Sequence, residues 1–163
     1  LCLSKGITGG YLPLSVVLCR EAIYQAFWHD DTRRGFLHSH SYTGNPLACR
    51  AALATLDIFD AHDVLGANRK LSAHITQRLR GIAGHTRIKY FRNRGMIWAA
   101  DVETDLPDFN RRFYAQALQR GLLMRPLGNT IYLMPPYVLS SEDADWMADQ
   151  ALGALNDTLA ATS

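Results

Sequence analysis

The sequence contains no long apolar stretch and little cysteine. No run of eighteen apolar residues occurs among its 163 residues, so no transmembrane helix is expected, and no signal-peptide pattern is seen. The three cysteines, Cys2, Cys19 and Cys49, are odd in number and match no zinc or redox spacing. Free thiols are the ordinary state in a reducing compartment, so we expect a cytoplasmic protein.

A large excess of charge of either sign is also missing. The formal net charge is +2 at pH 7, with 20% charged and 48% hydrophobic residues, which is the balance of a soluble globular protein. This charge gives no reason to expect a nucleic acid or a membrane surface as partner. Residues 1–4 read as an apolar strand, which has little to pair with in isolation and favours a segment of a longer chain.

The spacing of apolar residues and the positions of glycine and proline predict that the chain is organised in two parts. In the first part we expect buried strands at 1–4 and 14–19, a short helix over 20–28, a buried helix over about 46–59 and an amphipathic helix over about 64–82. In the second, from about residue 84, we expect strands at 88–91 and 96–102, a helix over 106–120, a strand pair formed by 122–125 and 131–134, and a last helix capped by Ser140 and Asp143. The second part is therefore predicted to be a compact α+β domain.

Lys5 directly follows the first expected strand and opens a glycine-rich loop. Burying an ammonium group is costly unless it is paired or neutralised, so lysine is a poor structural choice at this position. A lysine that forms a Schiff base avoids this cost, and glycines let the backbone approach a planar ring closely. A surface turn would use the same residues, and the motif by itself favours that plainer interpretation.

Residues 38–46, His-Ser-His-Ser-Tyr-Thr-Gly-Asn-Pro, place hydroxyl groups just before an expected helix start. Helix N-termini and nearby hydroxyls suit phosphate oxygens, whereas a polar loop that only caps its helix is the plainer alternative. His38 and His40 also suggest a metal, but two ligands without a third or fourth make a weak zinc site, and we expect none.

Arg125 ends an apolar stretch and is followed by a turn through Pro126 and Gly128. An arginine in such a position can clamp a carboxylate with two parallel hydrogen bonds. A structural ion pair would use the same residue, and the spacing alone does not separate the two.

Together, these three stretches resemble the class III aminotransferases, which are pyridoxal-phosphate enzymes of fold type I. Leu-Ser-Lys-Gly-Ile-Thr-Gly-Gly and Gly-Asn-Pro-Leu-Ala-Cys are shared in style across that class. The run Arg-Pro-Leu-Gly-Asn-Thr-Ile-Tyr-Leu-Met-Pro-Pro-Tyr is most similar to the branch that acts in biotin biosynthesis. The resemblance covers essentially the whole chain, but only the carboxyl-terminal part of the family's length. It implies an α/β fold, with the end of a large cofactor domain over 1–60, a connecting helix over 61–83 and a small α+β C-terminal domain over 84–163.

The resemblance also implies roles for individual residues. Lys5 would hold pyridoxal 5'-phosphate as a Schiff base and move the proton between substrate and cofactor. Ser41 would give its hydroxyl to the cofactor phosphate of the neighbouring subunit, with His40 alongside. Ser39 would lie near the substrate. Arg125 would clamp the substrate carboxylate, and Tyr132 would lie close to the same pocket.

The reaction implied for this branch moves an amino group from S-adenosylmethionine to 8-amino-7-oxononanoate, giving 7,8-diaminononanoate in a homodimer with shared active sites. The family's acidic partner for the pyridine nitrogen has no counterpart here, because Asp30 and Asp31 follow the lysine instead of preceding it. The chain alone is therefore expected to be inactive. Two alternatives remain: another class III enzyme acting on an ω-amino or ornithine-like donor, and a non-catalytic remnant that at most dimerises.

Overall fold

The computed structural model describes residues 1–160, which divide into two compact units at Val64 and Leu65. Residues 161–163, the end of the expected C-terminal domain, lie outside the described residues. Within the described part, no helix is long and apolar enough to cross a membrane.

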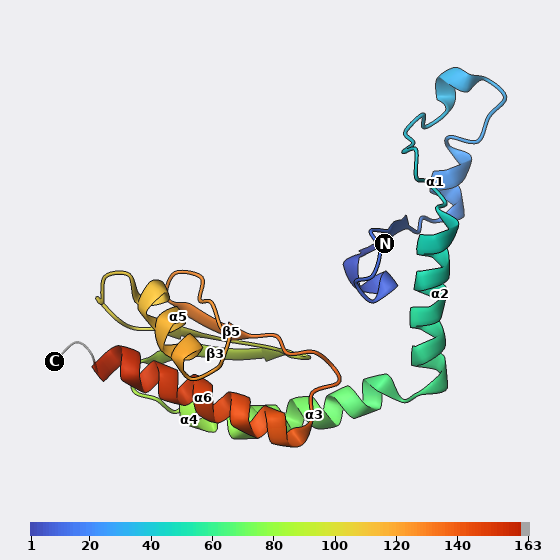
Figure 1. The fold of residues 1–163 in the computed structure, drawn as a ribbon. Helices are drawn as coiled ribbons and strands as arrows, with labels where there is room; N and C mark the ends of the chain where they lie inside the picture. Colours follow the sequence, from blue (N-terminus) through green and yellow to red (C-terminus); the bar gives the residue numbers. More distant parts are fainter. Residues whose placement is uncertain (161–163) are drawn as a thin grey trace. The chain divides into compact units, whose positions relative to one another are not determined.

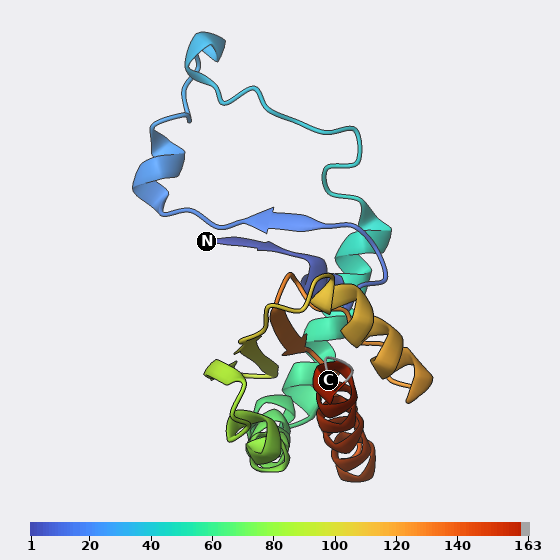
Figure 2. The same cartoon turned by 90° about the vertical axis from the view of Figure 1, so that its left-hand side faces the viewer.

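The first unit is built on two short antiparallel strands, β1 (Cys2–Ser4) and β2 (Ser15–Val17), which lie side by side in Figure 2. Leu3 pairs with Val16, and the connection between the strands begins with a 3-10 helix, η1 (Lys5–Thr8). The chain then forms α1 (Glu21–Gln25), η2 (Thr32–Arg34) and α2 (Pro46–Ala61). The predicted strands and helices of this unit are thus present, although β2 and α1 are shorter than expected.

The expected burial of β1, β2 and α2 is wrong for this chain. Both strands are largely exposed, and only Ala48 and Ala52 of α2 are buried. Leu47, Leu53 and Leu56 of the same helix are more than half exposed. An apolar surface is buried only where another element packs on it, and within this unit α2 contacts chiefly the short η1 segment.

The second unit is an α+β structure, as predicted. It contains α3 (Val64–Arg78), which begins at the last residue of the first unit, α4 (Arg80–Ala83), β3 (Ile88–Arg94), β4 (Ile97–Val102), α5 (Phe109–Gln119), β5 (Thr130–Leu133) and α6 (Ser141–Ala160). The strands form one antiparallel sheet in the order β3-β4-β5, and Figure 1 shows α6 running along it. The helix expected over 64–82 is interrupted at Leu79, which separates α3 from α4.

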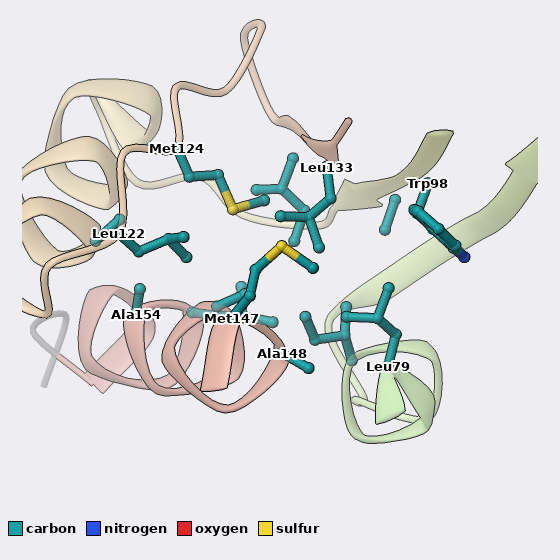
Figure 3. Packing of buried hydrophobic residues seen from close by; sticks show 14 of the residues in the cluster. Leu79, Trp98, Leu122, Met124, Leu133, Met147, Ala148 and Ala154 are labelled. Atoms are coloured by element: carbon teal, nitrogen blue, oxygen red, sulfur yellow. The ribbon is translucent and has the colours of Figure 1, made fainter. Parts of the chain in front are cut away.

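The core of the second unit lies between one face of the sheet and the helices. Trp98, Ala100 and Val102 are buried on β4 because alternate residues of a strand point to the same face. Met147 and Ala148 of α6 approach this face, and Figure 3 shows Met147 beside the side chains of Met124 and Leu133. Their burial makes this the better-packed of the two units. One face of the sheet is therefore covered by the helices, and the other face carries polar residues such as Asp101 and Thr130.

The expected pairing of residues 122–125 with 131–134 is wrong. Residues 122–125 form no strand, and β5 pairs instead with β4, where Tyr132 lies opposite Ala99. Leu127 and Thr130 exchange two backbone hydrogen bonds of 2.9 Å, which closes the turn before a longer ladder can form. Leu122 and Met124 are buried in the core instead.

The end of α5 and the start of α6 both follow signals that are visible in the sequence. Gly121 adopts a positive φ of 80° directly after α5, a conformation that glycine reaches without a Cβ penalty. The Asp143 amide donates to Ser140 Oγ at 3.0 Å, and the Ser140 hydroxyl donates to Asp143 Oδ2 at 2.6 Å. The predicted cap of the last helix is confirmed.

Asp101 joins all three strands on the open face of the sheet. The Thr130 hydroxyl donates to Asp101 Oδ1 at 2.8 Å, and Arg92 donates to the same oxygen at 3.2 Å. These two donors hold the pKa of Asp101 below its ordinary value of 3.8. Because the folded-state pKa is lowered, the ionised Asp101 stabilises the fold above pH 3.8, and this contribution is lost as the pH falls through the lowered pKa.

We therefore expect Asp101→Asn to lower the free energy of unfolding at neutral pH, by an amount that shrinks as the pH falls below 3.8. Urea unfolding from about pH 6 to about pH 2 measures this dependence. Asp105→Asn, which removes an exposed carboxylate of the same unit, is the matched control against which the Asp101→Asn series is compared. A difference between wild type and Asp101→Asn that is constant across the series would contradict the assignment.

Candidate active site

Lys5 lies at the junction of β1 and η1 with an unusual backbone. Its φ is +51°, in the left-handed region that side-chain-bearing residues rarely adopt, while Ser4 before it is fully extended. Strain of this kind costs on the order of 1–3 kcal/mol and is concentrated at functional sites. The Lys5 amine has no hydrogen bond or ion pair with any residue of the described chain, 1–160. Lys5 is exposed in this structure, so the expected burial of its side chain is not observed.

The lysine hollow is a concavity of about 730 Å³ in the first unit, a size within the range of small-molecule sites. It is lined by residues 4–5, 12–15, 40, 42–45 and 48. Lys5 is its only cationic side chain apart from any charge on His40, and no carboxylate lines it. The hollow thus combines a free primary amine with the polar start of a helix.

The polar loop before α2 is folded by its own hydrogen bonds. His40 Nδ1 accepts from the Tyr42 amide at 3.1 Å, and the His40 amide donates to Thr43 Oγ1 at 3.1 Å. Asn45 caps α2 by accepting from the Leu47 amide at 3.0 Å, with Pro46 in the first turn. When neutral, His40 therefore carries its proton on Nε2, which leaves that nitrogen available as a donor.

The structure brings only some of the predicted cofactor and substrate residues of this unit together. Lys5 and His40 line the same hollow, whereas Ser39 and Ser41 belong to the loop but do not line it. Thr43 and Asn45 do line it and were not singled out as binding residues. The Gly-Asn-Pro helix start was the available signal for them, since a residue that caps a helix lies beside the amides that bind phosphate.

The arginine hollow is a separate concavity of about 660 Å³ in the second unit. It is lined by residues 114, 122–125, 132–136, 139, 143 and 146–147. Arg125 and Tyr132 both line it, and the family resemblance had implied that the two lie near one pocket. Most of the remaining lining side chains are apolar, including Met124 and Trp146.

Arg125 is available to a ligand. It is exposed and forms no hydrogen bond or ion pair within residues 1–160, so the alternative of a structural ion pair is not observed. Asp143 is the carboxylate of this hollow, and it is hydrogen-bonded to Ser140 at the start of α6. The guanidinium is thus unpaired in a mostly apolar hollow, and an unpaired arginine can bind a carboxylate with two parallel hydrogen bonds.

The comparison with protein families is decisive. The model for aminotransferase class III matches residues 1–155. The chain belongs to the class III aminotransferases. Among the described residues, no group of three or more His, Cys, Asp or Glu side chains could hold a metal ion.

The relatives refine this assignment. The chain is 44% identical over 149 residues to adenosylmethionine-8-amino-7-oxononanoate aminotransferase of Helicobacter pylori, covering 88% of this chain and 34% of that protein. The crystal structure of the enzyme of the same name from Methanocaldococcus jannaschii superimposes with a TM-score of 0.89 at 31% identity, covering 96% of this chain and 38% of the other. An amine transaminase from an uncultivated Pseudomonas species, solved in a PLP-bound form, gives 0.85 at 32% identity over 96% and 38% of the two chains. The chain therefore has fold type I and spans about a third of the length of the curated relatives it matches.

Class III aminotransferases depend on pyridoxal phosphate, and the lysine hollow fits part of that cofactor. The Lys5 amine can react with its aldehyde, while the helix start at Asn45 and the Thr43 hydroxyl suit its phosphate. A carboxylate for its pyridine nitrogen is not among the lining residues. The hollow thus supplies the covalent attachment and polar contacts, but not the acid.

Proposed function

We propose that the protein containing this chain transfers an amino group from S-adenosylmethionine to 8-amino-7-oxononanoate, giving 7,8-diaminononanoate in biotin biosynthesis in the cytoplasm. The observation that carries this proposal is Lys5, an unpaired amine on a strained backbone within the lysine hollow. The relatives named above support the choice of substrates, since several are called adenosylmethionine-8-amino-7-oxononanoate aminotransferase.

Lys5 has two tasks in this proposal. Its Nζ would hold the cofactor covalently until the substrate amine displaces it, and the freed amine would then move a proton between the substrate carbon and the cofactor carbon. Pyridoxal phosphate supplies the electron sink that stabilises negative charge at that carbon. An exposed amine without an ion-pair partner is free to move between these positions.

The loop before α2 holds the cofactor phosphate in this proposal. The Ser41 hydroxyl binds the phosphate of the neighbouring subunit, and His40 contributes alongside it. This arrangement requires a homodimer with shared sites. Ser39 lies near the substrate. Residues 1–60 form the end of the large domain, 61–83 the connecting helix and 84–163 the small domain.

Arg125 binds the terminal carboxylate of 8-amino-7-oxononanoate. The apolar lining of the arginine hollow suits the aliphatic chain that separates this carboxylate from the reacting amino ketone. Tyr132, half-buried on β5, lies in the same hollow and can donate its hydroxyl to the ligand.

A second candidate is an aminotransferase that uses simple amines or ω-amino acids. The similarity to the Pseudomonas amine transaminase favours it, since its identity to this chain, 32%, equals that of the Methanocaldococcus enzyme within one per cent. Arg125 weighs against a simple amine as substrate, because a simple amine has no carboxylate to pair with the guanidinium. An ω-amino acid does carry a carboxylate, so Arg125 does not argue against that part of the second candidate.

Separate half-reactions of the intact protein distinguish the two. The cofactor absorbance is followed first with S-adenosylmethionine, a primary amine or an ω-amino acid as donor, and then with 8-amino-7-oxononanoate as acceptor. The proposal predicts conversion by S-adenosylmethionine and re-conversion by 8-amino-7-oxononanoate. Conversion by the primary amine or the ω-amino acid alone would favour the second candidate.

A further inference from the structure

Thr8 is an unusual residue in the lysine loop. Among the described residues, two polar side chains are buried, Thr8 and Thr158, each with about 1% of its surface exposed. The Thr158 hydroxyl donates to Ala154 O within α6 at 2.6 Å, the ordinary bond of a helical threonine. Thr8 ends the short η1 helix beside exposed glycines, and its shortest hydrogen bond runs forward to Leu12, outside that helix.

The Thr8 hydroxyl ties the two ends of the loop together. It donates to Leu12 O at 2.6 Å, and it accepts from the Leu12 amide at 3.4 Å. Lys5 O lies 3.4 Å away on the other side, within reach of the same hydroxyl. One buried oxygen thus lies between the carbonyl of the reactive lysine and the residue that leads into β2.

The same loop is held from outside by α2. A Cβ placed on Gly9 would lie 3.4 Å from Thr55 Oγ1, so the helix already contacts the backbone next to Thr8. A left-handed φ such as that of Lys5 persists only where its surroundings determine it. The Thr8 side-chain bonds and the α2 contact act on this loop together with its backbone bonds, in which the Gly9 amide donates to Gly6 O at 2.9 Å and the Tyr11 amide donates to Thr8 O at 3.2 Å.

We infer that Thr8 is the positioning residue of Lys5. Its buried hydroxyl fixes residues 5–12 so that Lys5 keeps its left-handed backbone and its amine stays at the hollow. Thr8 does not line the hollow and acts only through Lys5. This inference rests on the proposed role of Lys5 as the cofactor lysine.

The test compares Thr8→Val, which keeps the shape but removes the hydroxyl, with Thr8→Ser, which keeps the hydroxyl. Thr158→Val is the matched control, because it removes the other buried threonine hydroxyl far along the chain from Lys5.

Two measurements are made on the intact protein. One is the rate at which acetic anhydride modifies Lys5 relative to Lys70 in the cofactor-free protein. The other is the pH midpoint of the visible absorbance after pyridoxal phosphate is bound.

We expect Thr8→Val to change the relative modification rate of Lys5 by roughly tenfold, the effect of one buried hydrogen bond, and to shift the absorbance midpoint. Thr8→Ser should restore both values, and Thr158→Val should leave both unchanged. If Thr8→Val does not fold, Thr8→Cys replaces it, because a thiol is a weaker hydrogen-bonding group of similar size. Thr8→Cys should change the modification rate of Lys5 and the absorbance midpoint in the same direction, but by less.

Wild-type values in every folded variant at position 8 would overturn the role of Thr8 while leaving Lys5 as the cofactor lysine. An intact wild-type protein that attaches no pyridoxal phosphate at Lys5 would overturn the proposed function as well, so the two failures are distinguishable.

Discussion

Replacing Lys5 with alanine is expected to abolish transamination by the intact protein while leaving weakened binding of pyridoxal phosphate. Alanine removes the covalent attachment and the group that moves the proton, and a positioned acid or base alone contributes on the order of 10²–10⁴ in rate. Polar contacts from the helix start at Asn45 and from Thr43 stay in place. Turnover and equilibrium dialysis with the cofactor measure the two effects separately.

Two controls sharpen this prediction. Lys5→Arg keeps the positive charge but has no amine that can react as a nucleophile, so it should be as inactive as alanine. Lys70→Ala removes another exposed lysine and should leave turnover unchanged. Full activity in Lys5→Ala would end the assignment of Lys5 and, with it, the proposed mechanism.

Replacing Arg125 with alanine is expected to weaken the half-reaction with 8-amino-7-oxononanoate by on the order of 2–5 kcal/mol. The bound carboxylate would lose its charged partner in a mostly apolar hollow. The half-reaction with S-adenosylmethionine should change less, because the proposal assigns Arg125 to the acceptor. Single-turnover rates for each half-reaction over a range of substrate concentrations measure the difference.

The controls for Arg125 separate charge from geometry. Arg125→Lys keeps the charge but loses the two parallel hydrogen bonds, so its loss should be intermediate. Arg111→Ala removes an exposed arginine of α5 that does not line the hollow and should affect neither half-reaction. An equal loss of both half-reactions in Arg125→Ala would refute the carboxylate assignment.

Local patterns predicted the elements of the fold well. The helix start at Gly44-Asn45-Pro46 and the cap at Ser140 were visible because each depends on residues within one turn. Burial was predicted poorly, since it depends on what packs against an element. Leu53 of α2 is exposed although its helix reads as a buried one. The pairing of residues 122–125 also failed, because the choice of a strand's partner is a property of the whole sheet.

The residues of the candidate site were also only partly predictable from the sequence. Of the residues named from the family resemblance, Lys5, His40, Arg125 and Tyr132 line a hollow, whereas Ser39 and Ser41 do not, and the roles of all six stay predictions. Thr8 could not be found, because nothing in a glycine-rich stretch says that one hydroxyl turns inward and bonds back to the chain. Its importance is visible only in the hydrogen bonds to Leu12 and in the left-handed backbone of Lys5.

The central claim is that Lys5 is the lysine that bonds pyridoxal phosphate. In the most direct test, the intact protein is incubated with the cofactor and reduced with borohydride. The modified residue is then mapped by mass spectrometry. Within this sequence only Lys5, Lys70 and Lys89 compete, and the ion pair with Glu103 raises the pKa of Lys89, which makes its amine a poorer nucleophile at neutral pH. The account predicts a phosphopyridoxyl group confined to Lys5. Label spread over Lys70 and Lys89, or no label at all, would contradict it.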